Sequence, residues 1–314
     1  MQTILGATGQ IGTELARSLH RDHTDLIRLV SRNPKPLHET DELIPADLLD
    51  AESTLNAVKG SKVVYLTAGL PMDTARWVRE WPVIMTNVLR ACEQESAKLV
   101  FFDNTYMYPQ TSLPQTEETK FQPYGKKGEV RAQITNQMLE AMSQSRIEGM
   151  ICRAPEFYGP GKTQSITNAT ILENIAAGKP AKVFVSADTK RSLIYTPDAS
   201  RAMALLGNTA DAFGETWHLP CDDNRLTYRE FIELAGKASG QSASFKVIKK
   251  WQLKLAGLFN SVIRDAGELL PRYETDNVFM SEKFKNRFPK FEATTFEKGL
   301  MEYFSEVREK KDAS

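Results

Sequence analysis

The chain has 314 residues, 41% of them hydrophobic, which is enough for one large domain or two intimately packed ones. Its 40 basic and 40 acidic residues cancel, so the composition provides no overall attraction to nucleic acid or to an anionic membrane. No run approaches the roughly 18 consecutive apolar residues that a membrane-spanning helix needs.

The first predicted element is a glycine-rich turn between a strand and a helix. Ile4 and Leu5 end a buried strand, and residues 13–19 have helical periodicity. Such a turn leaves unpaired backbone N–H groups at the positive end of the helix dipole. A diphosphate fits there where no Cβ blocks its approach, which is why glycine is required. The turn predicts a dinucleotide-binding site formed by Gly6, Thr8, Gly9, Gln10, Ile11 and Gly12.

Strand-like and helix-like segments then alternate along the first half of the chain. The predicted strands are residues 26–30, 62–66, 98–102 and 149–152, and the predicted helices are 54–58, 83–93 and 130–142. This alternation indicates βαβ units and a doubly wound parallel α/β sheet, the Rossmann fold. Ligands of such sheets bind at the carboxyl ends of the strands, so the residues that follow each strand are the candidate site.

The second half has a looser pattern. It contains a helix at 169–177, a strand at 192–195, a helix at 196–206, a further sheet strand at 217–220 and a capping box at Thr227. We predict a dinucleotide-binding domain of residues 1–157 and 188–220. A smaller, mostly helical C-terminal substrate domain would comprise residues 158–187 and 221–314.

The end of the second strand bears on the choice of cofactor. An acidic residue there would accept the adenosine ribose hydroxyls and favour NAD, but the chain has Ser31 and Arg32 instead. Both side chains can bind a 2′-phosphate, so the sequence favours NADP, although NAD stays possible. The alternative is that Arg32 is only a surface arginine in a turn. Asp47 and Leu48 resemble a segment that caps an adenine. Small residues end a later strand, as expected where the backbone runs along a cofactor: Thr67, Ala68 and Gly69. The alternative for both segments is a loop between elements.

Four stretches carry a more specific resemblance: GATGQIG at 6–12, TNVLRACEQESAKLVFFDN at 86–104, RAPEFYGPG at 153–161 and SLIYTPDASRA at 192–202. They resemble the extended short-chain dehydrogenases/reductases of the NAD-dependent epimerase/dehydratase family, and the resemblance covers residues 3 to about 220. The resemblance implies a nicotinamide cofactor and transient hydride transfer at a carbinol carbon. The implied substrate is a sugar-like or other hydroxyl-bearing small molecule.

The chain departs from that family at the catalytic dyad. The family carries serine or threonine four residues before the tyrosine that Tyr108 matches, where this chain has Asn104, followed by Thr105. The family's tyrosine is followed four residues later by a lysine, which lowers the phenol pKa. Here Gly128 stands four residues after Tyr124. Shifting the register by three places Lys127 over the tyrosine and Arg131 over the lysine, and we prefer this register for its spacing from Asn104.

Several catalytic arrangements stay open. Tyr124 and Lys127 could share a helix face and act as acid and base. Lys127 and Arg131 could replace the dyad with a cationic site, or Tyr106 could supply the phenol. In a fourth alternative none of these side chains is catalytic, and the protein is a non-catalytic NADP-binding redox sensor or regulatory protein.

Other conspicuous residues read as structural. Trp77 and Trp81 are expected to pack on one helix face, Arg153 to be a buried hydrogen-bonding arginine, and the pair Lys249 and Lys250 to lie on a solvated surface. The isolated cysteines Cys92, Cys152 and Cys221 indicate reduced thiols, and the four scattered histidines indicate no metal site. The N-terminus enters the first strand almost at once, which leaves no room for a signal peptide, and we expect a cytoplasmic protein. We further expect a monomer or homodimer that binds a small-molecule substrate and has no nucleic-acid or membrane partner.

Overall fold

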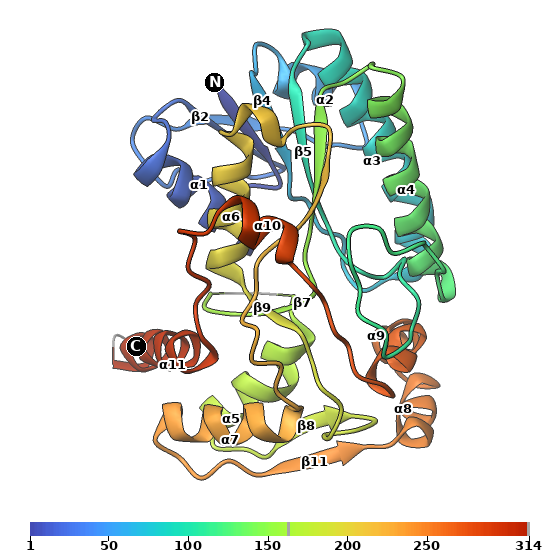
Figure 1. Cartoon of the computed structure of the whole chain (residues 1–314), viewed down its shortest axis with the longest axis vertical. Coiled ribbons are helices and arrows are strands. Elements are labelled where there is room, and N and C mark those ends of the chain that lie inside the picture. Colours follow the sequence, from blue (N-terminus) through green and yellow to red (C-terminus); the bar gives the residue numbers. More distant parts are fainter. Residues whose placement is uncertain (162–163, 313–314) are drawn as a thin grey trace. The chain divides into compact units, whose positions relative to one another are not determined.

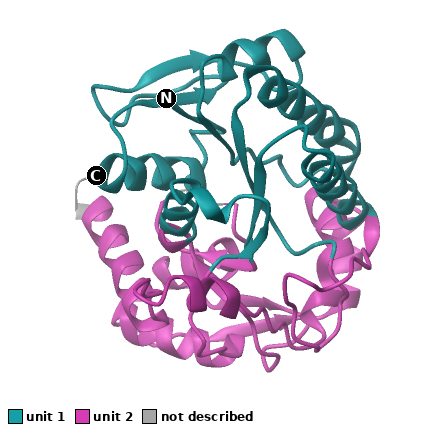
Figure 2. Ribbon diagram, turned by 45° about the horizontal axis from the view of Figure 1, so that its top comes forward, with its two compact units in different colours: residues 1–107, 126–154, 199–219 teal, residues 108–125, 155–198, 220–314 magenta. Residues whose placement is uncertain are grey.

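The computed structural model describes residues 1–161 and 164–312, which form two compact units (Figure 2). Unit 1 comprises residues 1–107, 126–154 and 199–219, and unit 2 comprises residues 108–125, 155–198 and 220–314. Residues 108–125, 155–157, 188–198 and 220, which the sequence-based division assigned to the dinucleotide-binding domain, belong to unit 2.

Unit 1 is built on a seven-stranded sheet in which every neighbouring pair is parallel. Its strands are β1 (Gln2–Leu5), β2 (Ile27–Ser31), β3 (Glu42–Pro45), β4 (Val63–Leu66), β5 (Lys98–Asp103), β6 (Gly149–Arg153) and β10 (Thr216–His218). They lie in the order β10-β6-β5-β4-β1-β2-β3. This is the predicted Rossmann fold, and its strand order reverses between β1 and β4, the place where doubly wound sheets bind ligands.

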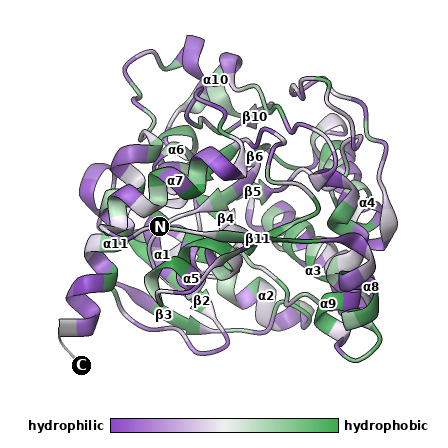
Figure 3. Ribbon diagram, turned by 90° about the horizontal axis from the view of Figure 1, so that it is seen from below, coloured by the Kyte–Doolittle hydropathy of each residue, from purple (hydrophilic) through white to green (hydrophobic). Residues whose placement is uncertain are grey.

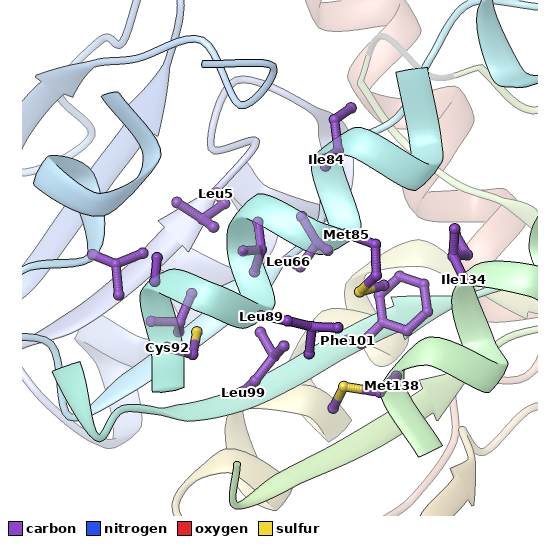
Figure 4. Packing of buried hydrophobic residues seen from close by; sticks show 14 of the residues in the cluster. Leu5, Leu66, Ile84, Met85, Leu89, Cys92, Leu99, Phe101, Ile134 and Met138 are labelled. Atoms are coloured by element: carbon purple, nitrogen blue, oxygen red, sulfur yellow. The ribbon is translucent and has the colours of Figure 1, made fainter. Parts of the chain in front are cut away.

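Helices cover both faces of this sheet (Figure 1). They are α1 (Gln10–Asp22), α2 (Ala51–Val58), α3 (Thr74–Glu95), α4 (Gly125–Ser143) and α6 (Thr196–Gly207). On one face, α3 and α4 pack on the strands through a continuous apolar core that includes Leu89, Phe101 and Met138 (Figure 4). On the other face α6 is tied to α1, because Ser200 Oγ donates to the carbonyl oxygen of Ile11 at 3.0 Å.

The start of α3 differs from the prediction. The helix begins at Thr74 rather than Val83, and it continues through Pro82. Asp73 caps it by accepting a hydrogen bond from the backbone N–H of Arg76 at 2.9 Å. A proline inside a helix removes one backbone donor, which is why the sequence pattern placed the boundary after it. The earlier start brings Trp77 and Trp81 onto the buried face of the helix, as expected.

Unit 2 contains two small parallel sheets and several short helices. Strand β7 (Glu156–Tyr158) pairs with β9 (Leu193–Tyr195), and β8 (Ala181–Phe184) pairs with β11 (Phe245–Ile248). The helices are η1 (Asn168–Leu172), α5 (Glu173–Ala176), α7 (Tyr228–Ser239), α8 (Lys250–Gly257), α9 (Ser261–Ala266), η3 (Gly267–Tyr273), α10 (Glu282–Arg287) and α11 (Phe296–Asp312), and η2 (Ala210–Ala212) belongs to unit 1.

An aromatic core holds unit 2 together. The ring of Tyr158 lies 5.5 Å from the rings of Phe231 and Phe296, and all three side chains are buried. The predicted capping box at Thr227 is confirmed: Thr227 and Glu230 bond reciprocally at the start of α7. Across the described residues, no helix combines the length and the apolar character needed to cross a bilayer.

Candidate functional site

The glycine turn between β1 and α1 has the geometry of an anion site. Gly9 is the N-cap of α1, with extended backbone at φ −77° and ψ 159°, and no side chain caps the helix. The first turn contains no acidic residue. The first backbone N–H groups of α1 therefore have no capping side chain. They lie at the positive end of the helix dipole, which attracts negative charge.

The three glycines are required for different reasons. A Cβ on Gly6, whose φ is +97°, would lie 2.6 Å from the backbone of Ala68, and a Cβ on Gly12 would lie 2.6 Å from the carbonyl oxygen of Gly6. A Cβ on Gly9 would meet its nearest atom, the same carbonyl oxygen, at 3.3 Å. Gly6 and Gly12 are thus demanded by the fold, whereas the fold has nearly enough room for a side chain at Gly9. The cradle at Gly9 fits a ligand that needs close approach to the backbone.

Ser31 and Arg32 follow this turn at the end of the neighbouring strand β2. The Ser31 hydroxyl oxygen is buried and has no hydrogen-bond partner within the described part of the chain. Arg32 is exposed, and the described residues give it no hydrogen bond or ion pair. Two uncommitted donors therefore stand beside the glycine turn, as an anionic ligand group would require.

The other predicted cofactor residues are placed by local contacts. Asp47 Oδ1 accepts from the N–H of Leu49 at 3.0 Å, and the Leu48 carbonyl oxygen accepts from Asn87 Nδ2 at 3.0 Å. Thr67 Oγ1 donates to the carbonyl oxygen of Leu5 at 3.1 Å, which ties the end of β4 to β1. The remaining members lie at or near the surface or against the core: Thr8 and Gly69 are exposed, Gln10 and Ala68 are half-buried, and Ile11 is buried.

A buried ionic cluster lies at the carboxyl end of β5. The Asp103 carboxylate lies 3.3 Å from Arg153 Nη2 and 3.5 Å from Arg131 Nη1. It also accepts from Thr135 Oγ1 at 2.9 Å. One carboxylate is thus shared by two guanidinium groups. These three buried ionic residues therefore have a net charge of one positive unit. Arg153 is the buried hydrogen-bonding arginine that the sequence predicted.

Arg131 is held by aromatic rings as well as by Asp103. Its guanidinium carbon lies 4.3 Å from the ring centre of Trp81 and 5.2 Å from that of Trp77. Burial lowers the pKa of Arg131, and the charges of Asp103 and Tyr106 oppose this effect. Its Nε is buried and has no hydrogen-bond partner among the described residues. Arg131 therefore provides a desolvated cation with a donor still available.

The predicted residues Tyr106 and Arg131 come together in the structure. The Tyr106 ring stacks on Trp77, with ring centres 5.9 Å apart and planes 20° apart, and Arg131 lies over the same indole. Asn104 Oδ1 accepts from the Tyr106 N–H at 2.9 Å and so positions the backbone that carries the phenol. Thr105, between them, is buried. This arrangement places a phenol within the electrostatic influence of a cation.

Lys127 and Tyr124 differ from one another sharply. Lys127 is fully buried on α4, one turn before Arg131, and its Nζ donates to Thr74 Oγ1 at the start of α3. Tyr124 lies just before α4, which begins at Gly125, a glycine with a positive φ of +73°. The Tyr124 side chain is 54% exposed. The alternative in which Tyr124 and Lys127 share a helix face does not fit the structure, because Tyr124 lies before the first residue of α4.

The sequence reasoning did not single out Asp103, Thr135 or Thr74. A signal for Asp103 existed, since it is an acidic residue directly after an apolar strand, at the edge of the sheet where ligands bind. The partners on α3 and α4 gave no signal, because their contacts join residues that are distant in sequence. The described residues contain no histidine, cysteine and carboxylate group of three or more that could hold a metal ion.

Unit 2 contains a second buried ionic cluster around Glu156. Its carboxylate accepts from the hydroxyl groups of Tyr228 and Tyr273, each at 3.0 Å, and from Arg191 Nη2 at 3.1 Å. Burial by itself would raise the pKa of Glu156, but Arg191 and Arg272 outweigh it and the pKa is lowered. The carboxylate is therefore ionised within the core of unit 2.

Comparison with known proteins identifies the family of this chain. The model of the NAD dependent epimerase/dehydratase family matches residues 3–219. The chain belongs to this family. No curated protein matched the chain at the level required for a relative.

Several solved structures share the fold. A UDP-glucuronic acid 4-epimerase from Bacillus cereus, in complex with UDP-glucuronic acid and NAD, is 16% identical with a TM-score of 0.82, covering 98% of this chain and 99% of that one. A UDP-glucose 4-epimerase from Thermus thermophilus, in complex with NAD, is 16% identical with a TM-score of 0.78 and the same coverage. A dTDP-glucose 4,6-dehydratase from Streptomyces venezuelae is 14% identical with a TM-score of 0.78, covering 100% and 98%. At these identities the likeness establishes the fold.

Proposed function

We propose that this protein is an NADP-dependent oxidoreductase or epimerase/dehydratase that acts on a sugar-like or other hydroxyl-bearing small molecule by hydride transfer. The observation that carries the proposal is the cradle at Gly9, which combines an uncapped helix N-terminus with a glycine that the fold itself barely requires. Membership of the epimerase/dehydratase family supports catalysis over the non-catalytic alternative.

The residues around β1, β2 and β4 would hold the cofactor. The α1 N-terminus would bind the diphosphate, and Ser31 and Arg32 would bind the 2′-phosphate of NADP. All three structural neighbours named above are NAD complexes, so a nicotinamide dinucleotide is supported, and the preference for NADP rests on Ser31 and Arg32. A bound cofactor of this class supplies a hydride acceptor that can return the hydride to the substrate.

Proton transfer would depend on Tyr106 and Arg131. Tyr106 would exchange a proton at its phenolic oxygen with the substrate hydroxyl, and the buried Arg131 would stabilise the negative charge that develops there. Lys127, one turn earlier on α4, adds a second buried cation, which is held by Thr74. The same two cations, Lys127 and Arg131, could instead bind an anionic group of the substrate. Sugars linked to nucleotides, as in the neighbours' complexes, carry such groups and are the first substrates to test.

The test is turnover by the purified chain with NADP or NAD and a panel of nucleotide sugars and simple hydroxyl compounds. Product chromatography is needed beside nicotinamide absorbance, because an epimerisation returns its hydride. We expect Arg131→Ala to lower kcat/KM at least about tenfold, since a lost charge-assisted contact in a desolvated site costs roughly 1.4 kcal/mol or more. Cofactor affinity should change much less.

Arg131→Lys and thermal melts are the controls, because Arg131 is also part of the Asp103 cluster. Tyr106→Phe should abolish turnover while the protein still binds the cofactor. If Arg131→Ala and Lys127→Ala both leave turnover intact while Tyr124→Phe abolishes it, the proposed register is overturned. Tight NADP binding without turnover of any compound would support the redox-sensor alternative.

Location and oligomeric state remain proposals from the sequence. We propose a cytoplasmic monomer or homodimer with reduced thiols, and the three cysteines are buried and unpaired as this requires. Likewise, the role of unit 2 as the substrate domain is proposed from the family resemblance.

A further inference from the structure

Unit 2 exposes a cluster of large apolar side chains on the helical hairpin α8–α9. Its members, which we call the hairpin patch, are Trp251 (62% exposed), Leu255 (52%), Leu258 (74%), Phe259 (88%) and Val262 (55%). They lie within twelve consecutive residues, 251–262, so they form a patch rather than the scattered single residues that are normal on a surface. Along α8 and the turn to α9 the ribbon shows hydrophobic colour interrupted by hydrophilic positions (Figure 3).

The local fold holds this patch outward. Helices α8 and α9 pack closely, and a Cβ on Gly257 would lie 3.1 Å from Arg264 Cα. Asn260 caps α9 by accepting from the N–H groups of Val262 and Ile263, at 3.0 and 3.2 Å. This cap fixes the turn that carries Leu258 and Phe259. On α8 only Leu253 and Gly257 are buried, and α9 buries no residue, so the apolar side chains are not explained by the core of unit 2.

The patch is surrounded by positive charge. Residues 245–266 contain five cations, Lys246, Lys249, Lys250, Lys254 and Arg264. Two of them form ion pairs, Lys250 with Glu274 and Arg264 with Asp265, and the described residues give the other three lysines no acidic partner. On the adjoining strand β11, Lys246 stands directly opposite Lys182 of β8, and both are exposed. Two like charges on neighbouring strands repel one another, and an anionic surface would reduce this repulsion. This charge is local, because the whole chain has a net charge of zero.

We propose that the hairpin patch docks the protein on the surface of a bilayer that contains anionic lipid. Short helices with apolar and aromatic residues on one side and lysines beside them bind in the interfacial plane, through buried apolar area and attraction to anionic headgroups. Tryptophan is enriched at that depth. A second copy of the chain is a poorer occupant, since pairing two hairpin patches would bring the unpaired lysines of one copy against those of the other. Lys249 and Lys250 are exposed, as the sequence predicted, and Lys249 would face the lipid headgroups.

Vesicle binding by the full chain tests this proposal. The chain is mixed with vesicles of phosphatidylcholine alone, or of phosphatidylcholine with phosphatidylglycerol, and the bound fraction is measured by sedimentation. Trp251 also reports directly, because the other three tryptophans, Trp77, Trp81 and Trp217, are buried. We expect sedimentation with the anionic vesicles, a blue shift of the emission, and loss of both at high salt.

Matched variants separate the apolar and electrostatic contributions. The double variant Leu258→Ser with Phe259→Ser should abolish binding, whereas Leu113→Ser, at a site 71% exposed elsewhere in unit 2, should not. Lys246→Gln and Lys254→Gln should each weaken partitioning about fivefold, and Lys290→Gln should leave it unchanged. All these positions are exposed, so the thermal transition of each variant should match the wild type.

Three results would overturn the proposal. The first is no binding to anionic vesicles, and the second is equal binding to neutral and anionic ones. The third is a concentration-dependent dimer that Phe259→Ser dissociates, without vesicle binding, which would assign the patch to a second copy of the chain.

Discussion

Replacement of Gly9 by valine should separate cofactor binding from folding. The φ of Gly9 is −77°, which any residue adopts, and a Cβ there would meet its nearest atom, the Gly6 carbonyl oxygen, at 3.3 Å. The unliganded variant should therefore fold, with at most a small loss of stability. Its branched side chain would occupy the space that a diphosphate needs at the α1 N-terminus.

The magnitude follows from linkage. At a cofactor concentration a hundredfold above Kd, binding stabilises the wild type by about 2.7 kcal/mol. For a chain of 314 residues, with an unfolding entropy of about 2.1 cal/mol/K per residue, this raises Tm by about 4 °C. Differential scanning fluorimetry with and without NADP should show this rise in the wild type and none in Gly9→Val.

Gly12→Ala is the comparison variant. Its Cβ would lie 2.6 Å from the Gly6 carbonyl oxygen and 2.9 Å from Ala7 Cα, so it should lower the Tm of the unliganded protein. An undiminished cofactor-induced shift in Gly9→Val would refute the assignment of this turn as the diphosphate site.

Three further predictions concern separate groups. Arg32→Ala should weaken NADP binding by about 1.5–3 kcal/mol and leave NAD binding unchanged in calorimetric titrations, and an equal loss for both would make Arg32 a generic contact. Glu156→Gln should lower Tm most at neutral pH, because Arg191 and Arg272 lower the pKa of the Glu156 carboxyl against the effect of burial. The stability that the ionised carboxylate contributes is fully present above the pKa of Glu156 in the unfolded chain. It is lost as the pH falls through the lower pKa of the folded chain. Melts from neutral to acidic pH should therefore show the wild type and variant converging, and a constant difference would contradict this. Burial raises the pKa of the Cys92 and Cys221 thiols to about 12 in each case, so a thiol reagent at mild pH should label no cysteine of the folded chain and all three after denaturation.

The features that the sequence predicted well depend on local pattern. The glycine turn, the apolar strands and the Thr227 capping box are each specified within a few residues, and the parallel sheet follows from the alternation of strands and helices. The strand predicted at 217–220 is confirmed as β10, beside β6 at the edge of the sheet. The start of α3 was missed because Pro82 is a helix breaker in most contexts, and here the packing of Trp77 and Trp81 outweighs that local preference.

The features that were missed depend on residues far apart in sequence. Asp103 meets Arg131 and Arg153 only because the ends of β5 and β6 and the buried face of α4 meet at one place. The same limit applies to the hairpin patch, because the pattern of α8 marks its apolar positions without showing which of them another element covers. Similarly, the alternative that paired Tyr124 with Lys127 required a helix that included both residues, and the structure shows that α4 begins only at Gly125.

The two halves of the proposed chemistry have different structural origins. On the cofactor side the proposal depends on backbone geometry, since Gly6 is required by the backbone of Ala68 at the end of β4 and Gly12 by contacts within the turn itself. On the proton-transfer side the proposal depends on side chains from three elements, Tyr106 after β5, the indole of Trp77 on α3 and Arg131 on α4, in place of the tyrosine and lysine expected for the family. A binding site made of backbone groups tolerates most side-chain substitutions nearby. The stacked arrangement of Tyr106, Trp77 and Arg131, in contrast, is lost when any one of the three side chains is removed. Variants of Trp77 or Arg131 should therefore lose turnover while they still bind the cofactor, so the binding and catalytic parts of the proposal can be refuted independently.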